Sequence, residues 1–175
     1  MGRVKRTHYG SACYHVCARG NNKRYLFEKL EAKERFLETL ARYQRRMKFK
    51  IYAFVIMGNH FHLLIEVDER FGISKVMQGI LLSFSLWYRR REKYVGHVWQ
   101  GRFTSRLVVD ESQLNANIYY IHMNHVRAKI VQSAIDYLWS SARFWESSGE
   151  VGTKVFGLGI TRGDTSDRSQ ITASV

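Results

Sequence analysis

Apolar positions along this chain follow two different periods, and the change from one period to the other predicts its elements. Over residues 31–48 and 73–93 the apolar residues recur every three or four positions, which is typical of amphipathic helices. Nearly continuous or alternating apolar runs predict four strands, over residues 9–18, 51–57, 60–67 and 106–109. A third helix is expected over residues 112–128, after the capping residue Asp110.

The predicted order is therefore β-α-β-β-α-β-α. This order favours an α+β fold of the ferredoxin-like type, in which two helices cover one face of an antiparallel sheet and a further helix follows. Residues 1–145 are expected to form this single domain. From residue 146 the composition shifts to glycine, serine and scattered charges, so residues 146–175 are expected to be a flexible tail.

The charge balance points to a polyanionic partner. Lys and Arg number 28 against 15 Asp and Glu, a net charge of +13, and residues 1–145 carry the excess. Such an excess favours nucleic acid. A membrane partner is not expected, because there is neither an apolar run of about 18 residues nor a leader-like segment. The two cysteines, Cys13 and Cys17, lack the second pair of a zinc site and are expected to be reduced thiols.

Candidate chemistry begins with the triplet His60-Phe61-His62 in the third predicted strand. Alternate side chains of a strand point to opposite faces, so the two histidines share one face and lie about 7 Å apart along the strand. Two imidazoles in this arrangement can hold one divalent metal ion, and nitrogen ligands alone suit manganese, cobalt or zinc better than magnesium. A third ligand has to come from elsewhere in the fold.

The third predicted helix offers such a ligand together with a nucleophile. Tyr120 and Asn124 are four residues apart and share one helical face. Tyr119 and His122 form a rival pair on a neighbouring face, and the spacing alone does not choose between the two tyrosines. A phenol held in line with a metal-bound phosphodiester is a competent nucleophile, and its attack leaves a covalent phosphotyrosine.

Several dispersed motifs in one order then resemble a known family. His60-Phe61-His62, followed about 60 residues later by Tyr120-Ile121-His122-Met123-Asn124, is similar to the HUH single-tyrosine transposases of insertion sequences, and in particular to the REP-associated tyrosine transposases. The resemblance covers roughly residues 8–145. The other matching stretches are His15-Val16 through Asn22, Met57 to His60, Trp99 to Phe103, Asn124 to Ala128 and Trp139-Ser140-Ser141.

The resemblance implies a role for each candidate. It implies His60, His62 and Asn124 as ligands of Mg²⁺ or Mn²⁺ and Tyr120 as the nucleophile that forms a 5′-phosphotyrosine. It implies single-stranded DNA beside a short hairpin as the substrate, nicking and strand transfer as the activity, and a cytoplasmic, nucleoid-associated bacterial protein. Whether the chain acts as a monomer or a homodimer stays open.

The chain departs from the family pattern in lacking proline altogether. The family usually has proline where this chain has Gly58 and His125. Glycine should allow the same turn with less rigidity, whereas the loss of proline at 125 leaves the end of the helix, and so Asn124, less defined.

Basic residues supply the candidate contacts to DNA, and two other functions compete with the enzyme. The candidates are Arg19, Arg89, Arg90, Arg102 and Arg106. The alternatives are a catalytically silent protein that binds DNA hairpins and a regulator that binds RNA through the same sheet and charges.

Overall fold

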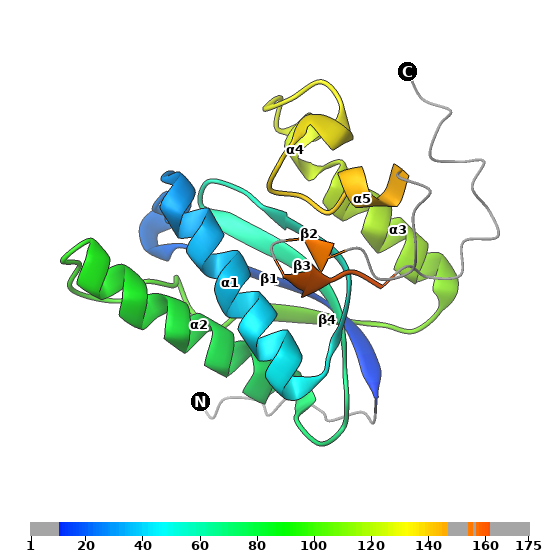
Figure 1. The fold of residues 1–175 in the computed structure, drawn as a ribbon, viewed down its shortest axis with the longest axis horizontal. Coiled ribbons are helices and arrows are strands. Elements are labelled where there is room, and N and C mark those ends of the chain that lie inside the picture. Colours follow the sequence, from blue (N-terminus) through cyan, green and yellow to red (C-terminus); the bar gives the residue numbers. More distant parts are fainter. Residues whose placement is uncertain (1–10, 147–153, 156, 162–175) are drawn as a thin grey trace.

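The computed structural model describes residues 11–146, 154–155 and 157–161 (Figure 1). The strands of the main sheet are β1 (Ala12–Arg19), β2 (Lys50–Ile56), β3 (His60–Val67) and β4 (Thr104–Val108). The helices are α1 (Leu30–Met47), α2 (Gly72–Arg91), α3 (Glu111–His122), α4 (Asn124–Arg127) and α5 (Arg143–Glu146). Two 3₁₀ turns, η1 (Asn21–Lys23) and η2 (Ala134–Asp136), and the short strands β5 (Lys154–Val155) and β6 (Leu158–Gly159) complete the described chain.

The predicted ferredoxin-like fold is confirmed. The sheet has the order β2-β3-β1-β4, and each neighbouring pair is antiparallel. This order makes β1 and β3 the two central strands. In the chain, α1 connects β1 to β2 and α2 connects β3 to β4. The β2–β3 turn closes where Gly58-Asn59 predicted it, with the Met57 N–H donating to the His60 carbonyl at 2.8 Å.

The two faces of the sheet have different roles. Phe61 points to the face covered by α1 and α2, where its ring lies 4.5 Å from that of Phe36 on α1. Phe36 in turn meets Phe84 of α2, with ring centroids 5.6 Å apart. The neighbouring His62 points to the other face, where its ring meets Tyr120 of α3. Figure 1 shows α3 and α4 on the opposite side of the sheet from α1 and α2. This second face remains available for a site.

The third helix is divided, although the sequence pattern predicted one helix over 112–128. Asp110 caps α3 as predicted, because its side chain accepts a hydrogen bond from the Gln113 N–H at 2.7 Å. At Met123, where φ is −90° and ψ is −1°, the regular helix is interrupted before α4 begins. His125 is fully buried in α4, with its Nε2 2.9 Å from the Ala134 carbonyl and its ring stacked on Tyr137. Buried contacts of His125 thus hold the turn in which proline was expected.

Gly58 lies beside the ring of Tyr25. A Cβ placed at Gly58 would approach that ring to 2.8 Å, so the proline of the family pattern requires the ring to move. Tyr25 is 66% exposed, so its ring can move into solvent. The backbone at Gly58 is not in the left-handed region, so neither the contact nor the backbone conformation demands glycine here.

Part of the predicted tail contacts the domain. Most of residues 146–175 lie outside the described residues, and the boundary at residue 145 stays a prediction. Within the described part, Leu158 and Ile160 are buried, and the Thr161 N–H donates to the Ile51 carbonyl at 2.7 Å. Gly159 exchanges two hydrogen bonds with the Gln44 side chain of α1. Residues 157–161 therefore extend the core beside α1 and β2.

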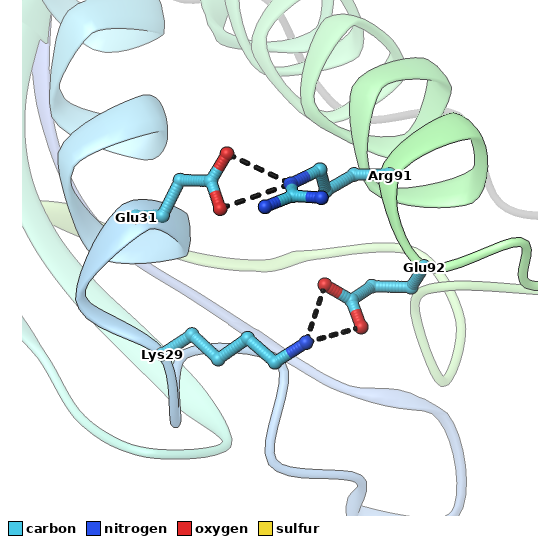
Figure 2. Close-up of polar contacts among 4 residues, drawn as sticks. All are labelled: Lys29, Glu31, Arg91 and Glu92. Carbon is cyan, nitrogen blue, oxygen red and sulfur yellow. Dashed lines mark hydrogen bonds and ion pairs between the residues drawn. The ribbon is translucent and has the colours of Figure 1, made fainter.

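Two ion pairs link the start of α1 to the end of α2. Figure 2 shows Lys29 against Glu92, with a shortest distance of 2.7 Å, and Arg91 against Glu31 at 2.9 Å. Most of these side chains are substantially exposed to solvent, where water and salt screen the attraction. The pairs therefore orient the helix ends and contribute little to stability.

Replacement of Phe36 by alanine is expected to lower the free energy of unfolding by about 3–5 kcal/mol, because the ring is fully buried and contacts three other aromatic rings. The double variant Glu31→Gln/Glu92→Gln is expected to leave the free energy of unfolding nearly unchanged, because these ion pairs are exposed to solvent. Urea unfolding of the three proteins measures both effects. Equal costs for the two variants would contradict the assignment of stability to the aromatic core.

Candidate active site

His60 and His62 lie on the face of the sheet that α3 approaches, as their alternation in β3 predicted. Their ring centroids are 5.2 Å apart and the rings are nearly perpendicular. In the central strand β1, Cys17 lies directly opposite His62 and Arg19 directly opposite His60. His62 is buried, with 9% of its surface exposed, and His60 is partly exposed. The two histidines thus form a polar, partly accessible patch on a strand whose other residues are mostly buried.

A cleft of about 530 Å³ opens between this face and α3. Among the described residues, its lining comes from β1, β3, β4 and α3: His15, Cys17, His62, Thr104, Arg106, Ala116, Asn117 and Tyr120. His60 and Asn124 lie outside this lining. The cleft is open to solvent.

Tyr120 is the tyrosine that faces the histidines. Its ring centroid lies 5.6 Å from that of His62 and 5.7 Å from that of His15, and 40% of the residue is exposed. The rival pair has no such geometry: His122 is buried, with its Nε2 2.8 Å from the Ser141 Oγ. The Arg127 guanidinium lies 5.5 Å from the Tyr120 ring and 5.9 Å from that of Tyr119. Proximity to His62 therefore favours Tyr120.

Burial keeps the histidines neutral. Desolvation, with a smaller contribution from Arg19, lowers the pKa of His60 to about 4. Desolvation together with the neighbouring rings of His15 and His60 lowers the pKa of His62 to about 3. Both rings therefore carry a lone pair at neutral pH, which is the protonation state that a metal ligand requires.

The ring nitrogens of His60 and His62 are suitable donors for a divalent metal ion. The Nδ1 of His60 lies 2.6 Å from the Asn59 Oδ1, and the Nδ1 of His62 lies 2.9 Å from the His15 Nε2. In both rings Nδ1 is occupied by a hydrogen bond, so Nε2 is the nitrogen left for a metal. In the described parts of the chain, no three His, Cys, Asp or Glu side chains are arranged so that they could hold one metal ion together. Further ligands would thus be amide, phosphate or water oxygens.

Comparison with known proteins places the chain in a family. Residues 8–124 match the family model described as "Transposase IS200 like", which is more than half of the chain. The chain belongs to the IS200-like transposase family. A Haemophilus influenzae relative, which its name assigns to the REP-associated tyrosine transposases, is 26% identical over 103 residues. That match covers 53% of this chain and 58% of the relative.

A solved structure supports the fold independently. The structure of a REP-associated tyrosine transposase bound to a REP hairpin is 19% identical and covers 97% of this chain and 96% of its own, with a TM-score of 0.70. The resemblance drawn from the dispersed motifs is thereby confirmed at the level of family and fold. In the part of this IS200-like chain that the structure describes, no helix is both long and apolar enough to span a bilayer.

The basic candidates for DNA contacts fall into two groups. Arg19 and Arg106 lie beside the histidines, because Arg106 pairs with His15 across β1 and β4 and lines the cleft. Arg102 is exposed in the loop before β4. Arg89 and Arg90 are exposed at the end of α2, a helix of the opposite face. The structure therefore brings Arg106 into the cleft lining and places Arg19 opposite His60, whereas Arg89 and Arg90 lie away from the cleft.

Two residues of the site were missed by the sequence analysis. His15 contacts both His62 and Tyr120, and Asn117 lines the same cleft one turn before Tyr120. His15 alternates with Cys17 and Arg19 in β1, a strand period that places all three on one face. That alternation was a usable signal for His15, whereas Asn117 required the packing of α3 to be known.

Acid is expected to destabilise the protein through its buried histidines. Their folded-state pKa values lie below the value of about 6.5 for an unfolded chain, so as the pH falls below 6.5 the unfolded state binds protons that the folded state does not. Burial lowers the pKa of His122 to about 3, which corresponds to a loss on the order of 2 kcal/mol at pH 5 relative to pH 7. Urea unfolding between pH 5 and pH 7 measures this loss.

The variant His122→Gln tests the assignment, because glutamine can bond to Ser141 but does not titrate. Its free energy of unfolding should depend less on pH than that of the wild type. An unchanged slope in His122→Gln would contradict the assignment.

Proposed function

We propose that the protein is a metal-dependent endonuclease and strand transferase of single-stranded DNA, acting next to hairpins of the REP type. The observation that carries the proposal is the position of Tyr120, whose ring lies 5.6 Å from that of His62 across an open cleft. Family membership supports a DNA-processing enzyme, and the neighbouring fold is that of a protein bound to a REP hairpin.

In the proposed reaction the Tyr120 Oη attacks the phosphorus of one phosphodiester. A bond forms between the Tyr120 oxygen and phosphorus, the bond from phosphorus to the 3′-oxygen breaks, and the leaving oxygen takes up a proton while the phenol loses one. The products are a 5′-phosphotyrosine and a free 3′-hydroxyl. Because the ester bond is conserved, a second 3′-hydroxyl can reverse the step and join a new strand.

His60 and His62 would hold Mg²⁺ or Mn²⁺, with Asn124 as the proposed third ligand. When bound, such an ion neutralises charge on the non-bridging phosphate oxygens. Asn124 begins α4 directly after the break at Met123, one turn beyond Tyr120. Arg19 and Arg106 flank the same face and would contact phosphates on either side of the scissile bond.

The test is incubation of the full chain with a labelled oligonucleotide that carries a hairpin and a single-stranded flank. A protein–DNA adduct that survives denaturation, forms with Mg²⁺ or Mn²⁺ and disappears in EDTA supports the enzyme. Tight binding without an adduct under any divalent ion would support the silent hairpin-binding protein instead. Preference for RNA of the same sequence would support the RNA-binding regulator. Both latter outcomes would overturn the proposal.

A further inference from the structure

His15 lines the cleft but is neither a proposed metal ligand nor the proposed nucleophile. It comes from the central strand β1, and its ring centroid lies 5.1 Å from that of His62 and 5.7 Å from that of Tyr120. Its Nε2 lies 2.9 Å from the Nδ1 of His62. Asn117 of α3 lines the same cleft. His15 thus lies between a residue proposed to bind metal and helix α3.

The hydrogen-bonding groups allow one direction for this chain of contacts when His62 binds a metal. A neutral His62 that offers Nε2 carries its hydrogen on Nδ1 and donates it to His15. The Nε2 of His15 then accepts, so the hydrogen of His15 is on Nδ1.

We propose that His15 is a positioning residue that sets the tautomer and orientation of His62. This inference rests on the proposed function, because it concerns the approach of a metal ion to His62. The second histidine uses a parallel device: the Nδ1 of His60 lies 2.6 Å from the Asn59 Oδ1, an atom that only accepts. In each case a fixed acceptor at Nδ1 directs Nε2 to the ion.

The choice of a neutral acceptor has an electrostatic consequence. Metal-binding histidines often donate to a carboxylate, which would bring a negative charge close to the ion. Here the acceptors are an imidazole and an amide, while Arg19 and Arg106 add positive charge on the same face. The hydrogen bond between His15 and His62, called the relay below, therefore orients His62 without repelling an anionic phosphodiester.

The first experiment measures binding of Mn²⁺ to the full chain without DNA, by electron paramagnetic resonance of the free ion. His15→Phe removes the acceptor and is expected to raise the dissociation constant for Mn²⁺ by about 10- to 100-fold. His15→Gln keeps an amide acceptor and should stay within about threefold of the wild type. His97→Phe, the same change at an exposed histidine, controls for non-specific sites.

The second experiment requires no variant. Long-range ¹H–¹⁵N correlation spectra of the metal-free wild type report which nitrogen of His62 carries hydrogen. A hydrogen on Nδ1 supports the relay, and a hydrogen on Nε2 overturns it, even where His15→Phe fails to fold.

The two proposals fail in distinguishable ways. If the wild type binds Mn²⁺ and forms the adduct, but folded His15→Phe binds Mn²⁺ with an unchanged dissociation constant, the relay is wrong and the proposed function stands. If the wild type neither binds Mn²⁺ nor forms an adduct, the proposed function is wrong, and the relay is wrong with it.

Discussion

Tyr120→Phe is expected to abolish the covalent protein–DNA adduct, a loss on the order of 10³-fold or more in rate. The variant removes one oxygen atom, the proposed nucleophile, and keeps the ring that packs 5.6 Å from His62. Because 40% of the residue is exposed, the loss of the hydroxyl should not alter folding. The measurement is denaturing electrophoresis of the labelled hairpin oligonucleotide after incubation with Mn²⁺.

Tyr119→Phe is the matched control, because the neighbouring tyrosine is equally exposed and also lies near Arg127. It should form the adduct at nearly the wild-type rate. Loss of the adduct in Tyr119→Phe but not in Tyr120→Phe would show that the nucleophile has been assigned to the wrong face of α3.

His60→Ala is expected to lower the rate of cleavage by about 10²- to 10³-fold or more, since a bound metal supplies several kcal/mol of stabilisation to the charge of the transition state. DNA affinity measured in EDTA should stay within about threefold, because contacts between basic side chains and phosphates supply most of the binding. His60 is the preferable variant, since it is partly exposed whereas the ring of His62 is buried.

Fluorescence anisotropy with the same hairpin oligonucleotide, at several salt concentrations, measures the affinity. Arg106→Gln serves as the contrasting control, because it should weaken binding and reduce the salt dependence while leaving the metal site intact. If His60→Ala lost affinity and cleavage together, the histidine pair would have a structural role instead.

Much of the fold was predictable because its signals are local. The alternation in residues 60–67 corresponds to β3, and the periodic stripes correspond to α1 and α2 within one or two residues. Asp110 was expected to cap a helix, and it does so. The break at Met123 was not predicted, because it accompanies the burial of His125 against Ala134 and Tyr137, contacts that no local pattern reveals.

Residue type and period alone placed His60 and His62 on one strand face and gave the chain the basic excess expected of a DNA-binding protein. Tertiary structure decided which helix packs against that face of the sheet and which tyrosine contacts the histidines. The sheet order brings β1 beside β3, so that His15 reaches the Nδ1 of His62, and the packing of α3 turns Tyr120 toward both rings. These contacts join residues 47 to 105 positions apart, and only the folded chain determines them.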